Sequence, residues 1–365
     1  MKKYILVICF LFFKIHAEQF IYPVADFDHG NQFMVLYQKS LREVELWIWN
    51  ASNQHALKGL SSFLTPANLR MMPSGKGFSF IDKGFIKIKE FAKRSPKTLP
   101  IYEPIGLFSS MNWIDDETFY FVAREGDFFQ IFQGNLQAKI QRLTNQPTDA
   151  LYPQKIGSTL FYMKRDMDCQ ISIVAQPWNP LKMNQLKKSS KITTLVPESY
   201  QQLCFLHMIS DREGFYLQAP HKKIEDDNLC YEFSCHHLKQ NEDQWENEKL
   251  FSIQIPSKYV TGSSRLYESL EPFLPNYTHE GIVYFTSWNY ESTEFELYKF
   301  DISNKNLEKI SEQFLYKNNN QQIFSPYLHG NKICCGFIIK DQKSIQNLFD
   351  ADDVYLELPY FDTKE

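Results

Sequence analysis

The stretch MNWIDDETFYFVAREGDFFQIFQGNLQAKIQRLT, residues 111–144, contains one complete structural unit of the chain. Its two central apolar segments, 118–122 and 130–132, are separated by the polar turn Gly126-Asp127. Aromatic and β-branched runs bounded by Gly, Asp and Asn are typical of β-strands. Together with the short segments at its two ends, the stretch predicts a small antiparallel sheet of four strands.

Units of this kind recur along the chain. Residues 271–311 repeat the pattern, and their segment 295–300 alternates apolar and polar residues as a half-buried strand does. Repetition at about 40 to 50 residues, with strands inside each unit, is typical of a β-propeller. We therefore predict an all-β fold, a single β-propeller of seven four-stranded blades, or of six if one stretched unit is divided wrongly. The recurring polar turns are Asp28–Asn31, Pro73–Lys76, Asp115–Glu117, Ile156–Ser158, Glu213–Gly214, His279–Gly281 and His329–Asn331.

The unit at 111–144 resembles the TolB-like propeller repeats, which are related to the WD-repeat group. The shared pattern consists of a turn at Asp116, an apolar strand at 119–122, Ile131-Phe132 and Leu143-Thr144. Residues 145–153 look like the usual entry to the next blade of that family. The resemblance implies a propeller, generally six-bladed, and a partner in envelope assemblies. It implies no catalytic, cofactor-binding or metal-binding residue.

The N-terminal residues have the features of a secretory signal peptide. Lys2 and Lys3 precede the apolar run 4–13, and the segment ends at the small residue Ala17. Such a run is too short to cross a bilayer. We expect residues 1–17 to be removed and residues 18–365 to form the propeller domain, periplasmic or secreted, with no later transmembrane segment.

The charge of the chain excludes one class of partner. The formal net charge is −4, and it becomes more negative once Lys2, Lys3 and Lys14 leave with the signal peptide. Sequence-independent nucleic-acid binding needs a concentrated basic face. We expect no nucleic acid as a partner, and we expect a monomer.

The last unit is one strand short. It contains segments at 325–327, 333–339 and 354–358, with few residues after them. An unpaired edge strand promotes aggregation, so a propeller must close. We predict that residues 20–22, just after the cleavage site, pair into this final blade.

The cysteines permit disulfide bonds in an exported protein. Cys334 and Cys335 are neighbours on one strand and point to opposite faces, which disfavours a bond between them. The favoured pair is Cys204 with Cys230 or Cys235. The alternative is that all six cysteines of the mature chain are small buried apolar residues; they are Cys169, Cys204, Cys230, Cys235, Cys334 and Cys335.

No catalytic motif is present. The chain has neither a G-x-S-x-G elbow nor a glycine-rich phosphate loop. Cys230 and Cys235-His236-His237 gather metal-ligand types, but no further ligand is identifiable, and His279-Glu280 lacks a second histidine at Val283. The acidic turns 166–168 and 350–353 lack the glycine and distal glutamate of a calcium loop. We therefore assign no catalytic residue, no cofactor and no metal.

Tryptophans and long polar excursions are the remaining signals for function. Trp47, Trp49, Trp178 and Trp288 either anchor a partner or pack between blades. The polar stretches 179–191, 239–248, 257–270 and 317–322 are interpreted as loops or linkers. We predict a non-catalytic scaffold for a protein or peptide partner. The alternative is a glycan lyase or hydrolase with histidines and carboxylates at the central channel, and a third possibility is a structural surface protein.

Overall fold

The structure is a computed structural model. It describes residues 19–28, 32–38, 44–50, 55–63, 67–82, 84–102, 111–179, 192–199, 203–225, 228–242, 244–257, 274–277, 281–310, 321–329, 332–339, 354–355 and 360–362. For residues 19–69 only the backbone is described. The predicted signal peptide, residues 1–17, lies outside the described residues.

The described elements are β-strands, arranged in six antiparallel sheets. Five sheets have four strands that follow chain order. Sheet B contains β5 (Ala67–Met71), β6 (Gly77–Asp82), β7 (Phe85–Glu90) and β8 (Lys97–Tyr102). Sheet C contains β9 (Met111–Trp113), β10 (Thr118–Glu125), β11 (Phe128–Asn135) and β12 (Ile140–Arg142). Sheet D contains β13 (Asp149–Ile156), β14 (Thr159–Arg165), β15 (Ile171–Pro177) and β16 (Thr193–Ser199).

Sheets E and F complete the set of four-stranded sheets. Sheet E contains β17 (Leu203–Met208), β18 (Glu213–Glu225), β19 (Asn228–Asn241) and β20 (Gln244–Pro256). Sheet F contains β21 (Asn276–Tyr277), β22 (Ile282–Asn289), β23 (Glu294–Asp301) and β24 (Asn306–Lys309). The unit predicted at 111–144 is therefore sheet C, with all four strands where the sequence placed them.

Sheet A joins the two ends of the chain. Its eight strands are β1 (Gln19–Asp28), β2 (Gln32–Gln38), β3 (Val44–Asn50), β4 (His55–Phe63), β25 (Gln321–His329), β26 (Lys332–Ile339), β27 (Val354–Tyr355) and β28 (Tyr360–Asp362). The order is β25-β26-β1-β2-β3-β4-β27, and β28 pairs with β26. This sheet is a finding that the expectation of uniform four-stranded blades did not include.

The predicted pairing of the N-terminal strand with the last unit is confirmed. Phe20 is opposite Ile338 and Ile21 is opposite Phe337, whereas Tyr22 pairs only with Leu36 on β2.

The C-terminal segment is placed differently from the prediction. Val354 is opposite Ala56 on β4, so residues 354–355 extend the first unit and not the last. The edge of β26 that they would have joined is occupied by β1 at one end and by β28 at the other.

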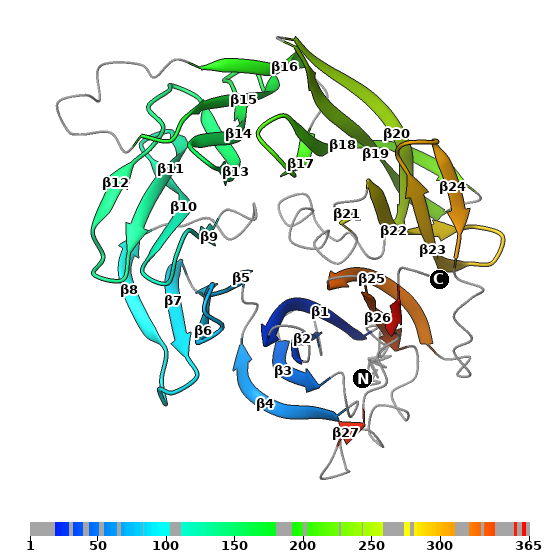
Figure 1. Ribbon diagram of the computed structural model, residues 1–365, viewed down its shortest axis with the longest axis horizontal. Coiled ribbons are helices and arrows are strands. Elements are labelled where there is room, and N and C mark those ends of the chain that lie inside the picture. Colours follow the sequence, from blue (N-terminus) through cyan, green and yellow to red (C-terminus); the bar gives the residue numbers. More distant parts are fainter. Residues whose placement is uncertain are drawn as a thin grey trace, which may run out of the picture.

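The sheets follow one another around a common centre, with the first strand of each sheet innermost (Figure 1). Strand β5 contacts β1 on one side and β9 on the other. Contacts continue from sheet C to D through β13, from D to E through β17, and from E to F between β20 and β22. Strand β25 of sheet A contacts β21, β22 and β23 of sheet F. Each sheet therefore packs on the next, and the last packs on the first.

The core lies between the sheets. The run Phe119–Ala123 on β10 is buried on both faces, as a strand covered on both sides requires. Phe119, Phe121 and Ala123 pack into a cluster with sheet B, whereas Tyr120 and Val122 pack into a cluster with sheet D. The unbroken aromatic run is explained by this position between two neighbours.

Backbone hydrogen bonds show the repeat. The Ile114 N–H donates to Thr118 O at 2.8 Å in sheet C, and the Ile209 N–H donates to Glu213 O at 2.9 Å in sheet E. The turn of sheet E occupies residues 209–212, so the expected turn at Glu213-Gly214 was placed too late, because these residues begin β18.

Part of the polar sequence interpreted as loops forms strands. Residues 239–248 belong to β19 and β20 with a short turn between them, and Gln321 and Gln322 begin β25. Polar side chains are compatible with these strands because the first part of β20 is largely exposed. Residues 180–191 and 258–270 lie outside the described residues.

The predicted disulfide is wrong. Cys230 and Cys235 are buried thiols outside any disulfide bond, and Cys169 is an exposed thiol. Cys204 lies on β17 and the other two lie on β19, and these strands pair with opposite edges of β18. Strands two places apart are about 10 Å apart, beyond the roughly 7 Å between Cα atoms that a disulfide spans.

Candidate functional site

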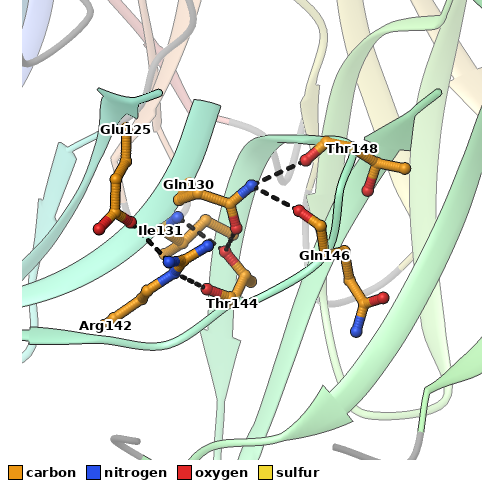
Figure 2. Close-up of polar contacts among 7 residues, drawn as sticks. All are labelled: Glu125, Gln130, Ile131, Arg142, Thr144, Gln146 and Thr148. Carbon is orange, nitrogen blue, oxygen red and sulfur yellow. Dashed lines mark hydrogen bonds and ion pairs between the residues drawn. The ribbon is translucent and has the colours of Figure 1, made fainter. Parts of the chain in front are cut away.

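The junction between sheets C and D contains a buried polar network (Figure 2). The Thr144 side chain is its centre. Its Oγ1 accepts from the Ile131 N–H at 2.9 Å and donates to Gln130 Oε1 at 2.8 Å. Thr144 and Gln130 are almost fully buried, so these bonds form without competition from water.

Gln130 connects this strand to the segment that leads into sheet D. Its Nε2 donates to Gln146 O at 3.0 Å and to Thr148 O at 2.8 Å. The Phe129 N–H donates to Asp149 Oδ1 at 2.9 Å, and Asp149 forms an ion pair with Arg165 at 2.6 Å. Because each of these groups has a hydrogen-bond or ion-pair partner within the network, the network connects sheet C to sheet D. We call it the joint between these sheets. Leu143-Thr144 and residues 145–153, on which the family resemblance was based, contribute residues to this joint.

Replacing Thr144 with valine tests the joint. Valine has nearly the same volume, but it leaves the buried Ile131 N–H and Gln130 Oε1 without the hydroxyl. We expect the free energy of unfolding to fall by about 2 to 3 kcal/mol in urea titrations. The Thr144→Ser control keeps the hydroxyl and loses only a methyl group, so it should lose about 1 kcal/mol. Equal losses in the two variants would contradict this role.

Sheet E differs from the other four-stranded sheets in the length of its strands. Strands β18, β19 and β20 have 13, 14 and 13 residues, longer than the strands of sheets B, C, D and F. Strand β17 pairs with β18 only as far as Gln218, whereas the β18–β19 ladder continues to Glu225 and Asn228. We call residues 219–225 and 228–232 the sheet E arm. Lys222 and Lys223 lie in its first strand.

The metal-ligand types noticed in the sequence also lie in sheet E. Cys235 and His237 share one face, as predicted, and His236 is on the other. His237 Nε2 is 2.8 Å from Glu213 Oε1, and its ring stacks on Phe215. Within the described part of the chain, no three His, Cys, Asp or Glu side chains converge in a way that would hold a metal. The Glu213 carboxylate and the Phe215 ring orient the His237 ring.

The tryptophans that the structure describes pack between strands. The Trp178 ring is half-buried, meets Tyr120 edge-on at 5.7 Å, and has Lys155 Nζ 5.6 Å from its centroid. Trp288 is half-buried and packs edge-on against Phe295 at 5.1 Å. Trp178 thus packs between sheets C and D, whereas Phe295 lies on the strand next to Trp288 within sheet F, beside the cluster shared with sheet E. The side chains of Trp47 and Trp49 lie outside the described residues.

One titratable cluster was missed by sequence reasoning. The Glu296 carboxylate, largely buried, accepts from Tyr298 Oη at 2.7 Å and from Lys309 Nζ at 2.9 Å. Desolvation raises the pKa of Glu296, but these hydrogen bonds outweigh it and hold the pKa below its usual value. The two-residue spacing of Glu296 and Tyr298 on one strand is the only sequence signal for it. The cluster is satisfied internally and stabilises sheet F.

Other candidates from the sequence have structural explanations or lie outside the description. Asp166 Oδ1 accepts from the Gln170 N–H at 2.8 Å and so closes the turn after β14. Residues 278–280 and 350–353 lie outside the described residues. No helix in the described ranges has the length and apolar character needed to cross a membrane.

Comparisons with known proteins concern the fold. No family model matches the chain, and no curated protein matches it. The tricorn protease structure aligns over 77% of this chain with a TM-score of 0.50 and 9% identity. TolB from Acinetobacter baumannii aligns over 64% with a TM-score of 0.40 and 11% identity. The β-propeller domain of the Trilobed protease from Pyrococcus furiosus aligns over 87% with a TM-score of 0.48 and 12% identity.

These similarities concern the fold alone, and TolB and a β-propeller domain are among the solved structures that this chain is similar to. The chain spans 29% of the tricorn protease chain, 63% of the TolB chain and 91% of the Trilobed protease domain. At these identities the matches say nothing about activity.

Proposed function

We propose that this chain is an exported, monomeric β-propeller scaffold that holds a protein partner through the sheet E arm. The observation that carries the proposal is the length of β18, β19 and β20, which continue beyond the strand that begins their sheet. Segments that extend from a rigid scaffold are where binding residues concentrate.

Sheet A also supports a proposal for the number of blades. We infer seven blades, with β1–β4 as the first and β25, β26 and β28 as the last. Support comes from a register irregularity in the first strand of several units: it occurs in β1, β5, β13, β17 and also in β25. In this reading residues 18–365 form one closed domain, and β1 joins its two ends.

The arm has the properties of a docking element. Its β18–β19 ladder continues from His221 opposite Glu232 to Glu225 opposite Asn228, so its two strands are already paired with each other without a partner chain. A preordered segment loses less conformational entropy on binding. Its sequence is rich in charged residues, namely Lys222, Lys223 and Glu225, together with Asp226 and Asp227 between its two strands in the sequence. Charged groups favour a partner of complementary charge over a buried apolar contact.

Export is proposed from the signal-like residues 1–17, with cleavage after Ala17. N-terminal sequencing of the protein recovered from its source, expected to begin at Glu18, tests this separately from binding.

A shortened arm tests the binding role. Replacing residues 224–229 with Asn-Gly joins Lys223 to Cys230, which are opposite each other in the ladder, through a two-residue turn. We expect the full chain to retain a partner from envelope or secreted extracts, and the shortened chain to lose it while melting at the same temperature.

Retention of the same partner by the shortened chain would show that the arm is not the docking element. If the full chain retains no partner and the purified chain degrades a polysaccharide, the scaffold proposal is wrong and the glycan lyase or hydrolase alternative is favoured. The matched control is Ser158→Ala, an exposed position in the turn between β13 and β14.

A further inference from the structure

Sheet E contains three histidine side chains within the described residues, and they lie on both of its faces. His207, Phe215 and His237 are opposite one another on three adjacent strands and share the face toward sheet F. His236 lies on the other face, opposite Tyr216. Tyr216 belongs to the apolar cluster shared with sheet D, so His236 lies on the face of sheet E that carries this cluster.

His236 has an unusual environment for an imidazole. Its ring stacks on Tyr216 with 4.8 Å between centroids and 10° between planes. Both ring nitrogens are buried, and neither has a hydrogen-bond partner. A neutral imidazole has one donor and one acceptor, and the protonated form has two donors. Protonation would therefore place a positive charge where no acceptor receives it.

The groups around His236 oppose its protonation. Lys249 on β20 is directly opposite His236 across the ladder and is the charged group that faces it. Tyr216 on β18 is the titratable group stacked on it, and the titratable members that sheet D contributes to the same cluster are the phenols Tyr152 and Tyr162. Desolvation, with a smaller effect of Lys249, lowers the pKa of His236.

The other two histidines are arranged differently. His237 has the Glu213 carboxylate 2.8 Å away, which can balance a positive charge. His207 stacks on Phe205 with 6° between planes, and burial lowers the pKa of His207 to about 4.

We propose that His236 is an acid-sensitive latch between sheets D and E, whose protonation loosens their contact and releases sheet E before the other sheets. The inference rests on the stacking and on the sealed ring nitrogens, and it does not depend on the arm binding a partner. A protein exposed to an acidic compartment would open at this position first.

The direction of the pH dependence follows from linkage. The unfolded or opened chain binds a proton on histidine near pH 6.5, whereas the closed state binds it only at lower pH. The stability contributed by neutral His236 is therefore fully present above about pH 6.5. It is lost as the pH falls from there toward the folded pKa of His236.

Hydrogen exchange measured by mass spectrometry tests the latch. Protection is compared at about pH 7.5 and pH 5 after correction for the intrinsic exchange rate, in β18 and β19 and, as an internal reference, in β10. We expect protection in sheet E to fall severalfold at the lower pH while β10 keeps its protection. The His236→Phe variant keeps a ring on Tyr216 but cannot take up a proton, so this pH dependence should disappear.

His237→Gln is the matched control, since it removes an imidazole from the same strand on the opposite face. It should keep the loss of protection at low pH. Equal pH dependence in the wild type and in His236→Phe would overturn the proposal, and so would a wild type whose sheets all open together. If His236→Phe does not fold, His236→Leu gives the same comparison.

Discussion

Replacing Phe121 with alanine is expected to lower the free energy of unfolding by about 3 to 5 kcal/mol. The ring is 1% exposed and lies between sheets B and C. It stacks on Phe132 at 5.6 Å and tilts against Phe119 at 5.9 Å. Neighbours held by two sheet ladders cannot collapse into the space that the ring leaves, so a cavity remains.

Urea unfolding followed by tryptophan fluorescence measures this effect. The control is Leu307→Ala on β24, where the side chain is 49% exposed and a change within about 0.5 kcal/mol is expected. A loss below about 1.5 kcal/mol for Phe121→Ala would mean that sheets B and C move together to fill the gap.

Gly77→Ala is expected to have the second large effect, a loss of about 2 to 3 kcal/mol from steric overlap. A Cβ at position 77 would overlap the backbone carbonyl of Lys89 and lie 2.9 Å from Glu90 Cα. Both belong to β7, which pairs with β6 at this point, so the two strands would have to separate. Backbone atoms, unlike the end of a flexible side chain, cannot rotate out of the way.

Gly84→Ala is the matched control for this substitution. Gly84 has φ +76° in the turn between β6 and β7, and a Cβ there would meet nothing within 4 Å. Only the left-handed backbone disfavours alanine, at a cost of about 1 to 2 kcal/mol. In thermal unfolding, the Gly77→Ala variant should therefore have a lower melting temperature than the Gly84→Ala variant. The reverse order would show that β6 and β7 can separate at this point at little cost.

The sequence predicted sheet C closely because its signals are local. The alternation of apolar runs with Asp115-Asp116 and Gly126-Asp127 marked two of the three turns of that unit. The same reasoning failed in sheet E, where polar residues 239–248 were interpreted as a loop. These residues form strands because β19 and β20 pair with each other here, and the first part of β20 is largely exposed, which permits polar side chains.

The candidate sites were less predictable than the strands. Cys235 and His237 were correctly assigned to one face from their spacing, but the partner of His237, Glu213, is 24 residues earlier and is placed by the register of β18 on β19. The isolation of His236 required knowing that Tyr216 covers it and that sheet D packs on the same face.

Residue order by itself determined the repeated unit, the all-β class and the need for an N-terminal strand to complete the last unit. Those features depend on patterns within a few dozen residues, where turn chemistry and apolar alternation act directly. Only the tertiary structure decided that β27 extends the first unit, that β18–β20 continue beyond the end of β17, and that the ring nitrogens of His236 are buried without a hydrogen-bond partner. These outcomes depend on which distant strands share an edge or a face. Nearly every residue carries the same backbone donor and acceptor, so these groups do not determine which strands pair.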